Sequence, residues 1–260
     1  MEARFPRALS MDIFNLAIIF FVAMAGGSFG TLIGGTSILT IPTLILLGLP
    51  PHTAIGTDRF GIIGVGTAGW YEFHKQRLID YRAGLIVAVP ILFGTILGSN
   101  LVLQINEKTL RDVILAINIL LILFVLLNPK VGIEARLSAS RTHEVAIALL
   151  VSFLVGVYGG FYGALAGTFT LYIFLLWFGH TFIQGAGTQK IASIFMTVTA
   201  TTVFAFHGAV DFRFGFAMFL GCLIGSYFGA HYASRIGNVW VKRVFTGFMI
   251  FVIGRLIISR

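Results

Sequence analysis

The chain has 260 residues, of which 57% are hydrophobic and only 11% are charged, and its mean hydropathy is +0.95. Soluble domains carry about 25% charged residues, and roughly 55–60% of their folded surface is already apolar, so a water-soluble fold could not cover this much more apolar area. A β-barrel would alternate apolar and polar residues, whereas this chain has apolar runs of about twenty residues. The composition therefore predicts an all-α integral membrane protein.

The net charge of +8 indicates a negatively charged partner, which could be nucleic acid, anionic lipid or an anionic substrate. Nucleic acid is excluded as a partner, because the chain has no basic tail and no polybasic cluster. Positive loops beside the lipid bilayer explain most of the excess charge, and a small anionic substrate would explain the rest.

Motifs of catalysis are missing from the chain. It has no paired His with Glu, no nucleotide-binding G-x-x-x-x-G-K-[ST] loop and no Ser-His-Asp set. The one cysteine, Cys222, excludes a disulfide within the chain. We therefore expect no enzyme, no catalytic residue, no metal and no cofactor.

The N-terminus resembles a cleaved secretory signal, because two arginines precede an apolar stretch that ends in Ala23-Met24-Ala25. We nevertheless expect no cleavage, because the apolar stretch continues to Leu49.

The first apolar segment, 12–49, would form a helix of about 57 Å, far longer than a hydrocarbon core of about 30 Å. It must therefore break into a helix and a second, shorter helical arm, which we expect to be re-entrant. The glycines that predict the break are Gly26, Gly27, Gly30, Gly34 and Gly35. Pro42 is expected to strengthen it.

Three further segments of the first half have about the twenty residues that a crossing helix needs. They are 52–73, 82–105 and 109–128. The second half offers the same order of segments, and its opening segment is expected to break at 155–167. The segments are 145–179, 181–207, 213–236 and 240–258.

Glycines and polar residues recur at an offset of 131 positions. The first set is Gly48, Gly56, Thr57, Asp80, Arg82, Gly84, Gly94 and Gly98, and the second is Gly179, Gly187, Thr188, Asp211, Arg213, Gly215, Gly225 and Gly229. We interpret the chain as two tandem repeats, 1–128 and 143–260, joined by a polar cytoplasmic linker, 129–142.

Basic residues predict the orientation in the membrane. If each opening segment makes one net crossing, the bundle has about eight transmembrane helices, both termini are cytoplasmic, and Arg82 and Arg213 both face the cytoplasm with most other basic residues. If each opener crosses twice, ten crossings and an inverted repeat result, and the charge bias nearly disappears. We prefer eight crossings.

Two cations, Arg59 and Lys190, lie inside apolar segments at equivalent positions of the two repeats, in IGTDRFG (55–61) and AGTQKIA (186–192). A cation at such a depth costs about 2.5–3.5 kcal/mol. A water-filled cavity for an anion would explain both, since Arg offers a planar fork to two oxygens and Lys a compact point charge. The alternative is structural: the two side chains reach the interface, or pair with Asp58.

Neighbours of the two cations complete the predicted site. Gly56-Thr57 and Gly187-Thr188 would supply hydroxyls, and backbone N–H groups if the helix opens there; a half-helix N-terminus would add its positive end. Asp58 is interpreted as a counter-ion, with proton carrier as the alternative, and its partner Gln189 cannot titrate.

Two further pairs of motifs are expected to shape the architecture. Asp80 and Asp211 each precede a segment and are expected to cap a helix. The paired glycines of the third segments are expected to let helices touch closely. They are Gly94, Gly98, Gly225 and Gly229.

The chain resembles the sulfite exporter TauE/SafE family of membrane proteins over about residues 12–258. The resemblance is carried by GGSFGTLIGGTSILTIPTLILLGLPPHTAIGTDRFG, YEFHKQRLIDYR and GTILGS, and in the second half by AGTQKIA and HGAVDFRFG. The second opener, YGALAGTFTLYIFLLWFG, lacks the dense glycines and the proline of that pattern. At the Gly-Thr sites, Asp-Arg and Gln-Lys stand where many members have an uncharged serine.

The resemblance implies a bacterial or archaeal inner-membrane transporter of sulfite or organosulfonates such as sulfoacetate or toluenesulfonate. We therefore expect a secondary transporter for a small anion. The alternatives are an anion channel and a non-catalytic membrane subunit. The sequence leaves open whether the protein forms a homo-oligomer.

Overall fold

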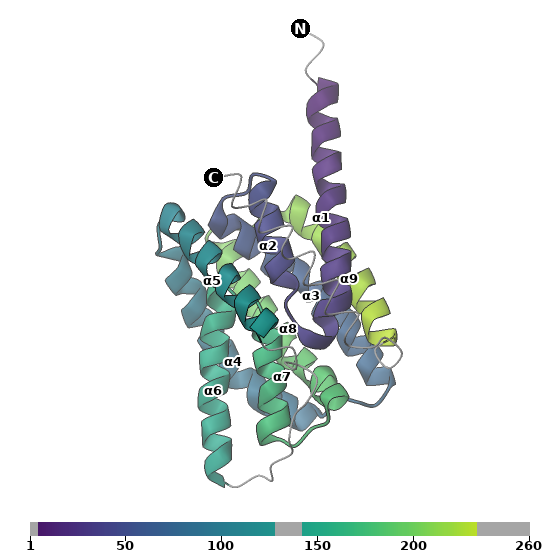
Figure 1. Cartoon of the computed structure of the whole chain (residues 1–260), viewed down its shortest axis with the longest axis vertical. Coiled ribbons are helices and arrows are strands. Elements are labelled where there is room, and N and C mark those ends of the chain that lie inside the picture. Colours follow the sequence, from purple (N-terminus) through teal and green to yellow (C-terminus); the bar gives the residue numbers. More distant parts are fainter. Residues whose placement is uncertain (1–4, 128–141, 233–260) are drawn as a thin grey trace.

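The computed structural model describes residues 5–127 and 142–232, and this part of the chain is helical throughout, as expected (Figure 1). The helices of the first half are α1 (Phe5–Ile33), α2 (Thr36–Leu46), α3 (Pro51–Lys75), α4 (Tyr81–Leu103) and α5 (Glu107–Leu127). Those of the second half are α6 (Thr142–Phe161), α7 (Ala166–Trp177), α8 (Phe182–Phe206) and α9 (Phe212–His231). The predicted segment 240–258 and nearly all of the linker 129–142 lie outside the described residues.

Several of these helices suit a lipid environment. Four are long and apolar enough to cross a membrane, over Ile13–Leu32, Tyr81–Leu103, Phe182–Phe206 and Phe212–His231. α2 and α7 are apolar but short, with 11 and 12 residues. The described part of the chain therefore has the character of a multi-pass membrane protein.

The first opening segment breaks where its last two glycines stand. α1 ends at Ile33 and α2 begins at Thr36, and both Gly34 and Gly35 have a positive φ, 80° and 97°. That backbone conformation is accessible to glycine at little cost and strained for other residues. After the break α2 runs back beside α1 (Figure 1), and Thr36 Oγ1 donates to the Gly26 carbonyl at 3.1 Å.

The other residues expected at this break have different positions. Gly26, Gly27 and Gly30 remain inside α1, where they allow close approach of neighbouring segments: a Cβ on Gly26 would lie 3.2 Å from Thr36 Cγ2. Pro42 lies inside α2 and is buried there, so it does not form part of the break.

The second opening segment also breaks within the predicted range. α6 ends at Phe161 and α7 begins at Ala166, and the turn between them contains Gly163 with φ 72° and Leu165 with φ 62°. Each opener is therefore a helix followed by a short arm.

α3 and α8 lie side by side and run in opposite directions. Gly187, near the start of α8, packs on Phe73 at the end of α3 and on Leu78 in the loop after it. Gly56, near the start of α3, packs on Phe204 at the end of α8 and on Ala209 in the loop after it. The loops that follow α3 and α8 therefore lie at opposite ends of the bundle.

This direction corrects the predicted orientation. Arg82 follows the loop after α3 and Arg213 follows the loop after α8, so the two cannot both face the cytoplasm. In the first opening segment, α1 and α2 run in opposite directions (Figure 1). This differs from the single net crossing per opening segment that we assumed in predicting eight transmembrane crossings. The number of crossings and the side of the termini stay predictions, because residues 233–260 are not described.

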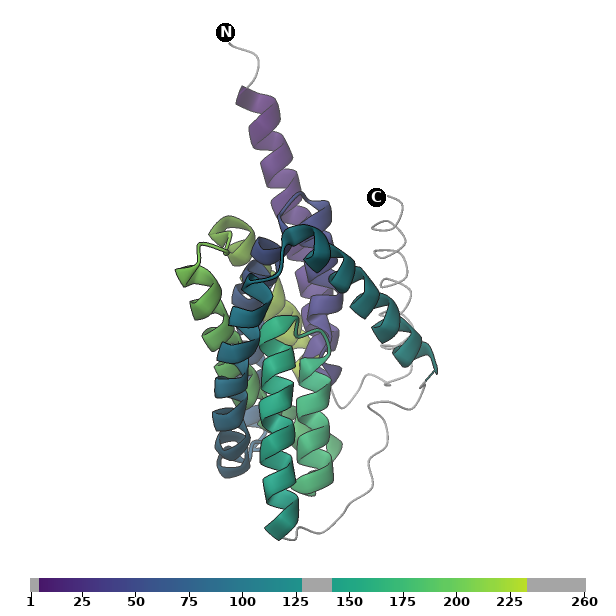
Figure 2. The same ribbon diagram turned by 90° about the vertical axis from the view of Figure 1, so that its left-hand side faces the viewer.

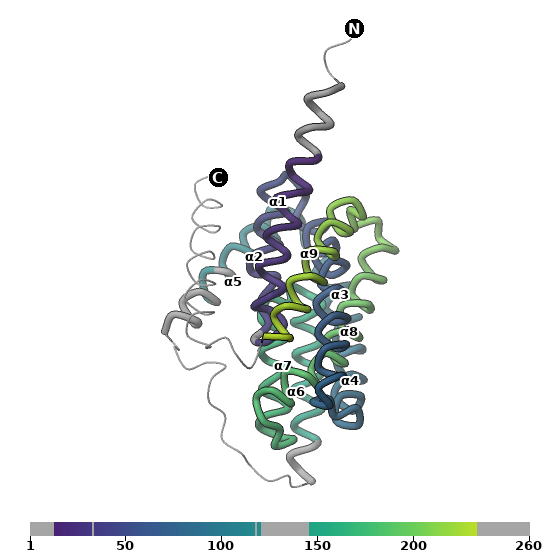
Figure 3. Tube along the Cα trace, turned by 90° about the vertical axis from the view of Figure 1, so that its right-hand side faces the viewer, coloured from purple at the N-terminus to yellow at the C-terminus, as the bar shows by residue number. Residues whose placement is uncertain are grey.

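Helices of one half pack on helices of the other half. α4 lies against α6 (Figure 2) and α9 lies against α1 (Figure 3). A Cβ on Gly94 would lie 2.8 Å from Val157 N in α6, and one on Gly225 would lie 3.0 Å from Met24 Cα in α1. The predicted close helix contacts at these glycines are confirmed.

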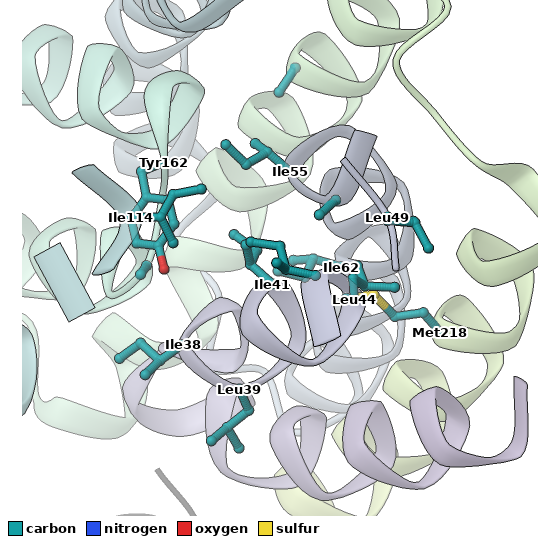
Figure 4. Packing of buried hydrophobic residues seen from close by; sticks show 14 of the residues in the cluster. Ile38, Leu39, Ile41, Leu44, Leu49, Ile55, Ile62, Ile114, Tyr162 and Met218 are labelled. Carbon is teal, nitrogen blue, oxygen red and sulfur yellow. The ribbon is translucent and has the colours of Figure 1, made fainter. Parts of the chain in front are cut away.

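The main hydrophobic core surrounds α2. Side chains of this short helix point toward residues of α3, α9 and the second opener (Figure 4). They include Ile38, Leu39, Ile41 and Leu44, which pack with Ile55, Ile62, Tyr162 and Met218. Because α2 is enclosed by protein, a helix too short to cross the bilayer is held at membrane depth.

Both predicted helix caps are confirmed. Asp80 accepts from Ala83 N–H at 3.0 Å, and Asp211 accepts from Arg213 N–H at 2.9 Å. The Ala83 bond, with a smaller contribution from His180, lowers the pKa of the Asp80 carboxyl below its ordinary value.

Replacement of Gly98 by alanine is expected to separate α4 from α6. The new Cβ would collide with the Val157 carbonyl, and overpacking of this kind costs about 1–3 kcal/mol. Thermal unfolding in detergent measures the effect. Leu97→Ala is the matched control, because Leu97 is 45% exposed on the same helix, and its midpoint should change little. Equal stability of the two variants would contradict the close contact.

Candidate functional site

The two helix breaks meet in the middle of the molecule. A Cβ on Gly34 would lie 2.8 Å from Thr168 N, and one on Gly167 would lie 3.2 Å from Gly34 Cα. The N-termini of α2 and α7 therefore abut. The first N–H groups of a helix have no partner within the helix, and its N-terminus carries a partial positive charge, so this junction favours an anion.

A cavity of about 40 Å³, taken as the space open to the centre of a water molecule, lies at this junction. It is lined by the first residues of α2 and α7, by Arg59 from α3, and by Gln189, Lys190 and Ser193 from α8. One water needs about 10–15 Å³ on this measure, so the cavity has room for a few waters or a small oxyanion.

Arg59 is buried and bound on three sides. Its Nη2 donates to Asp58 Oδ2 at 2.8 Å, to Ser37 Oγ at 3.0 Å and to the Tyr162 carbonyl at 2.7 Å. The side chain therefore joins α3 to α2 and to the turn after α6. Its Nε is buried without a hydrogen-bond partner, and Gly163, with its positive φ, leaves the space that the guanidinium occupies.

Asp58 is fully buried beside Arg59. It also accepts from Ser37 Oγ at 2.9 Å and from the Thr40 hydroxyl, both on α2. The ion pair balances one positive charge against one negative charge, so this half of the site is neutral.

Lys190 is also buried, at 2% exposure, but none of the described residues forms an ion pair or hydrogen bond with its ammonium group. Its Cδ and Cε pass close to Gly69, where a Cβ would lie 3.1 and 3.0 Å from them. The cavity wall therefore carries an amine that has no counter-ion among the described residues.

Gln189 precedes Lys190 and also lines the cavity. The side chain is 1% exposed, and neither its Nε2 nor its Oε1 has a hydrogen-bond partner. Buried polar groups normally have a hydrogen-bond partner in the protein or in water. The free Nε2 of Gln189 can therefore donate a hydrogen bond to a ligand, and its free Oε1 can accept one.

Thr57 and Thr188, which were predicted for the site, form hydrogen bonds outside the cavity. Thr57 Oγ1 accepts from Asp211 N–H at 2.8 Å, and Thr188 Oγ1 accepts from Asp80 N–H at 3.1 Å. Neither lines the cavity. Each hydroxyl instead joins a central helix of one half to the cap residue of the other half.

The glycines before these threonines are packing positions. Gly56 and Gly187 lie in helices that continue without a break, so no backbone N–H is freed there. Both are close to the loop that ends the opposite central helix. Of the predicted site residues, Arg59, Gln189 and Lys190 line one cavity and Asp58 binds Arg59.

Residues of the short arms were missed by the sequence reasoning. Ser37 and Thr40 hold Asp58, and Gly167 closes the cavity opposite Gly34. A signal was present, because small polar residues directly after paired glycines in an apolar segment are typical of an exposed helix start. In the described part of the chain, no three His, Cys, Asp or Glu side chains are grouped to hold a metal ion.

Comparison with known proteins finds several bacterial relatives. The chain is 28% identical over 221 residues to the probable membrane transporter protein YfcA of Escherichia coli K12, which covers 85% of this chain and 80% of the relative. It is 27% identical over 231 residues to a probable membrane transporter protein of Haemophilus influenzae (87% and 88%). It is 23% identical over 233 residues to the probable membrane transporter protein YdhB of Bacillus subtilis (87% and 92%).

No solved structure matches the chain. The family model described as sulfite exporter TauE/SafE matches residues 19–256, which is nearly the whole chain and includes both helix breaks and both cations. The protein therefore belongs to the sulfite exporter TauE/SafE family.

Proposed function

We propose that the protein is a secondary transporter that moves a small anion, sulfite or an organosulfonate, across the inner membrane through the cavity between α2 and α7. The observation that carries this proposal is the buried, unpaired Lys190. The relatives are named as probable membrane transporter proteins, and the matching family model is named for sulfite export.

The charges of the cavity support an anionic substrate. Arg59 and Asp58 cancel, so a protonated Lys190 would give the cavity a net charge of about one positive unit. An isolated buried charge is costly, and a bound anion would offset that cost. The N-termini of α2 and α7 and the free amide of Gln189 would bind the oxygen atoms of the anion. The small volume favours sulfite over sulfonates with large organic groups.

The relation between the two halves supports a transporter with two access states. α3 and α8 each have 25 residues and begin 131 positions apart. The Thr57–Asp211 and Thr188–Asp80 hydrogen bonds are equivalent under the same offset but lie at opposite ends of the bundle. We interpret the chain as an inverted repeat around one central site, the architecture in which one half can rock against the other.

Uptake of labelled sulfite into proteoliposomes tests the transport proposal. A secondary transporter gives saturable uptake, and sulfite inside the vesicles accelerates it. Flux that does not saturate and is not accelerated would indicate the alternative, an anion channel. No flux above that of protein-free vesicles would support the other alternative, a non-catalytic membrane subunit.

Replacement of Lys190 by methionine is expected to abolish sulfite binding. Methionine has a similar length but no charge, so the cavity loses its unbalanced positive charge. We expect at least a tenfold loss of affinity, measured as the thermal shift that sulfite causes, with unfolding in the absence of sulfite unchanged or at a higher temperature. Lys75→Met is the control, since Lys75 is exposed and lies over the Tyr71 ring. Normal sulfite binding by Lys190→Met would reject this site.

Replacement of Arg59 by alanine is expected to destabilise the fold. It leaves Asp58 buried without its cation and removes the bond to the Tyr162 carbonyl, and such a change costs about 3–5 kcal/mol. Unfolding measurements check this value. In the matched double variant, Asp58→Asn with Arg59→Met, no charge is left unpaired, and much of the lost stability should return. An unstable double variant with a stable Arg59→Ala protein would contradict the ion-pair role of both residues.

A further inference from the structure

A second buried carboxyl group, Glu72, lies near the end of α3. Its side chain is 8% exposed. Oε1 accepts from Gln76 Nε2 at 3.2 Å and lies 3.0 Å from His231 Nδ1. Oε2 is buried and has no hydrogen-bond partner. A carboxylate with one oxygen bound and the other free can take up a proton on the free oxygen without losing an existing bond.

His231 connects Glu72 to the surface. It is the last residue of α9, and its side chain is 50% exposed. Exposed aromatic residues around this end of the bundle mark a membrane interface. They are Trp70, Tyr71, Tyr81, Tyr227 and Tyr232. An imidazole at this place can exchange protons with water on one side and with the Glu72 carboxylate on the other.

Gly69 lies on α3 between Glu72 and the residues of that helix that line the cavity. Residues three apart on a helix lie on the same face, so Gly69 and Glu72 are separated by a little less than one turn, about 4.5 Å, along α3. A Cβ on Gly69 would lie 3.0 Å from Lys190 Cε, so the Lys190 side chain runs close beside Gly69, and Lys190 also lines the cavity. Glu72 therefore contacts the exposed His231 and lies about one helical turn from Gly69, beside which the Lys190 side chain runs.

Other titratable groups near this end of α3 have different contacts. His74 Nδ1 lies 2.7 Å from the Tyr81 hydroxyl, and Lys75 lies over the Tyr71 ring. Among the described residues, His231 from α9 is the titratable group that contacts Glu72 from an adjacent helix.

Asp58 does not offer the same chemistry. Both of its oxygens accept hydrogen bonds, and Arg59 holds it as a charged partner. The second half has no equivalent of the Glu72–His231 pair, because at an offset of 131 Glu72 corresponds to Val203 and His231 to Asn100. The repeat therefore places this pair at one end of the bundle and not at the other.

We infer that Glu72 binds the proton that accompanies the anion, and that His231 passes this proton between Glu72 and water. In each cycle one proton is taken from water at the His231 end, binds Glu72 Oε2, and is released with one anion to the opposite side, after which Glu72 is again a carboxylate. A monovalent anion and a proton together carry no net charge across the membrane. This inference rests on the proposed transport function.

Proteoliposomes with a trapped pH-sensitive dye test the inference. Methanesulfonate is the probe, because its sulfonate does not take up a proton near neutral pH and cannot itself carry one. A methanesulfonate gradient should drive proton movement through the wild-type protein. Exchange of labelled methanesulfonate across the same membranes is measured in parallel, so that transport and coupling are read separately.

Glu72→Gln should lose proton movement to the level of protein-free vesicles and keep labelled exchange within about twofold. Glu107→Gln is the matched control, because Glu107 lies 3.9 Å from His52 but is 59% exposed, and it should keep both activities. His231→Gln, on the surface, should slow proton movement several-fold relative to exchange. It also serves as the test if Glu72→Gln does not fold.

Three results would overturn the inference. These are exchange by the wild-type protein without proton movement, full proton movement in Glu72→Gln, and unchanged proton movement in His231→Gln if the Glu72 variant does not fold. If the wild-type protein exchanges neither methanesulfonate nor labelled sulfite, the proposed function fails as well, which distinguishes the two failures.

Discussion

Arg59 and Lys190 place two basic side chains inside an apolar bundle, where a charge is costly unless it is balanced. The bundle treats them differently. Arg59 is neutralised by Asp58 and uses its fork to join α2, α3 and the turn after α6. Lys190 has no such partner among the described residues and faces a cavity. Arg59 thus holds these elements together, whereas Lys190 lines the cavity without a counter-ion among the described residues.

Helix breaks make room for this site. At Gly34 and Gly35 the chain turns with a positive φ, and the same occurs at Gly163. Short helices start directly after each turn, so two helix N-termini meet at the level of the cations. Irregular backbone at membrane depth is tolerated only where protein or a polar cavity satisfies it, and in this bundle the cavity and the Arg59 guanidinium do so.

Much of this could be predicted from the sequence. The all-α membrane class follows from composition, the two breaks from clustered glycines, the caps from Asp80 and Asp211, and the close helix contacts from Gly94 and Gly225. These features depend on local backbone preference and on spacing along one helix, which a sequence displays directly. The burial of Arg59 and Lys190 was also predictable, because both stand inside apolar segments, where a charge is costly.

The tertiary structure alone decided which of those polar residues face one another. Thr57 and Thr188 stand beside the cations in sequence, yet their hydroxyls bind the opposite half, because successive residues of a helix point about 100° apart. Ser37 and Thr40 reach Asp58 only because α2 folds back. The antiparallel course of α3 and α8, which places Arg82 and Arg213 at opposite ends, depends on packing between distant segments. The lipid environment, the helices and the helix breaks could be predicted from the sequence, since they depend on composition and local backbone preference. The relative direction of α3 and α8 and the hydrogen-bond partners of the polar residues depend on contacts between the two halves of the chain.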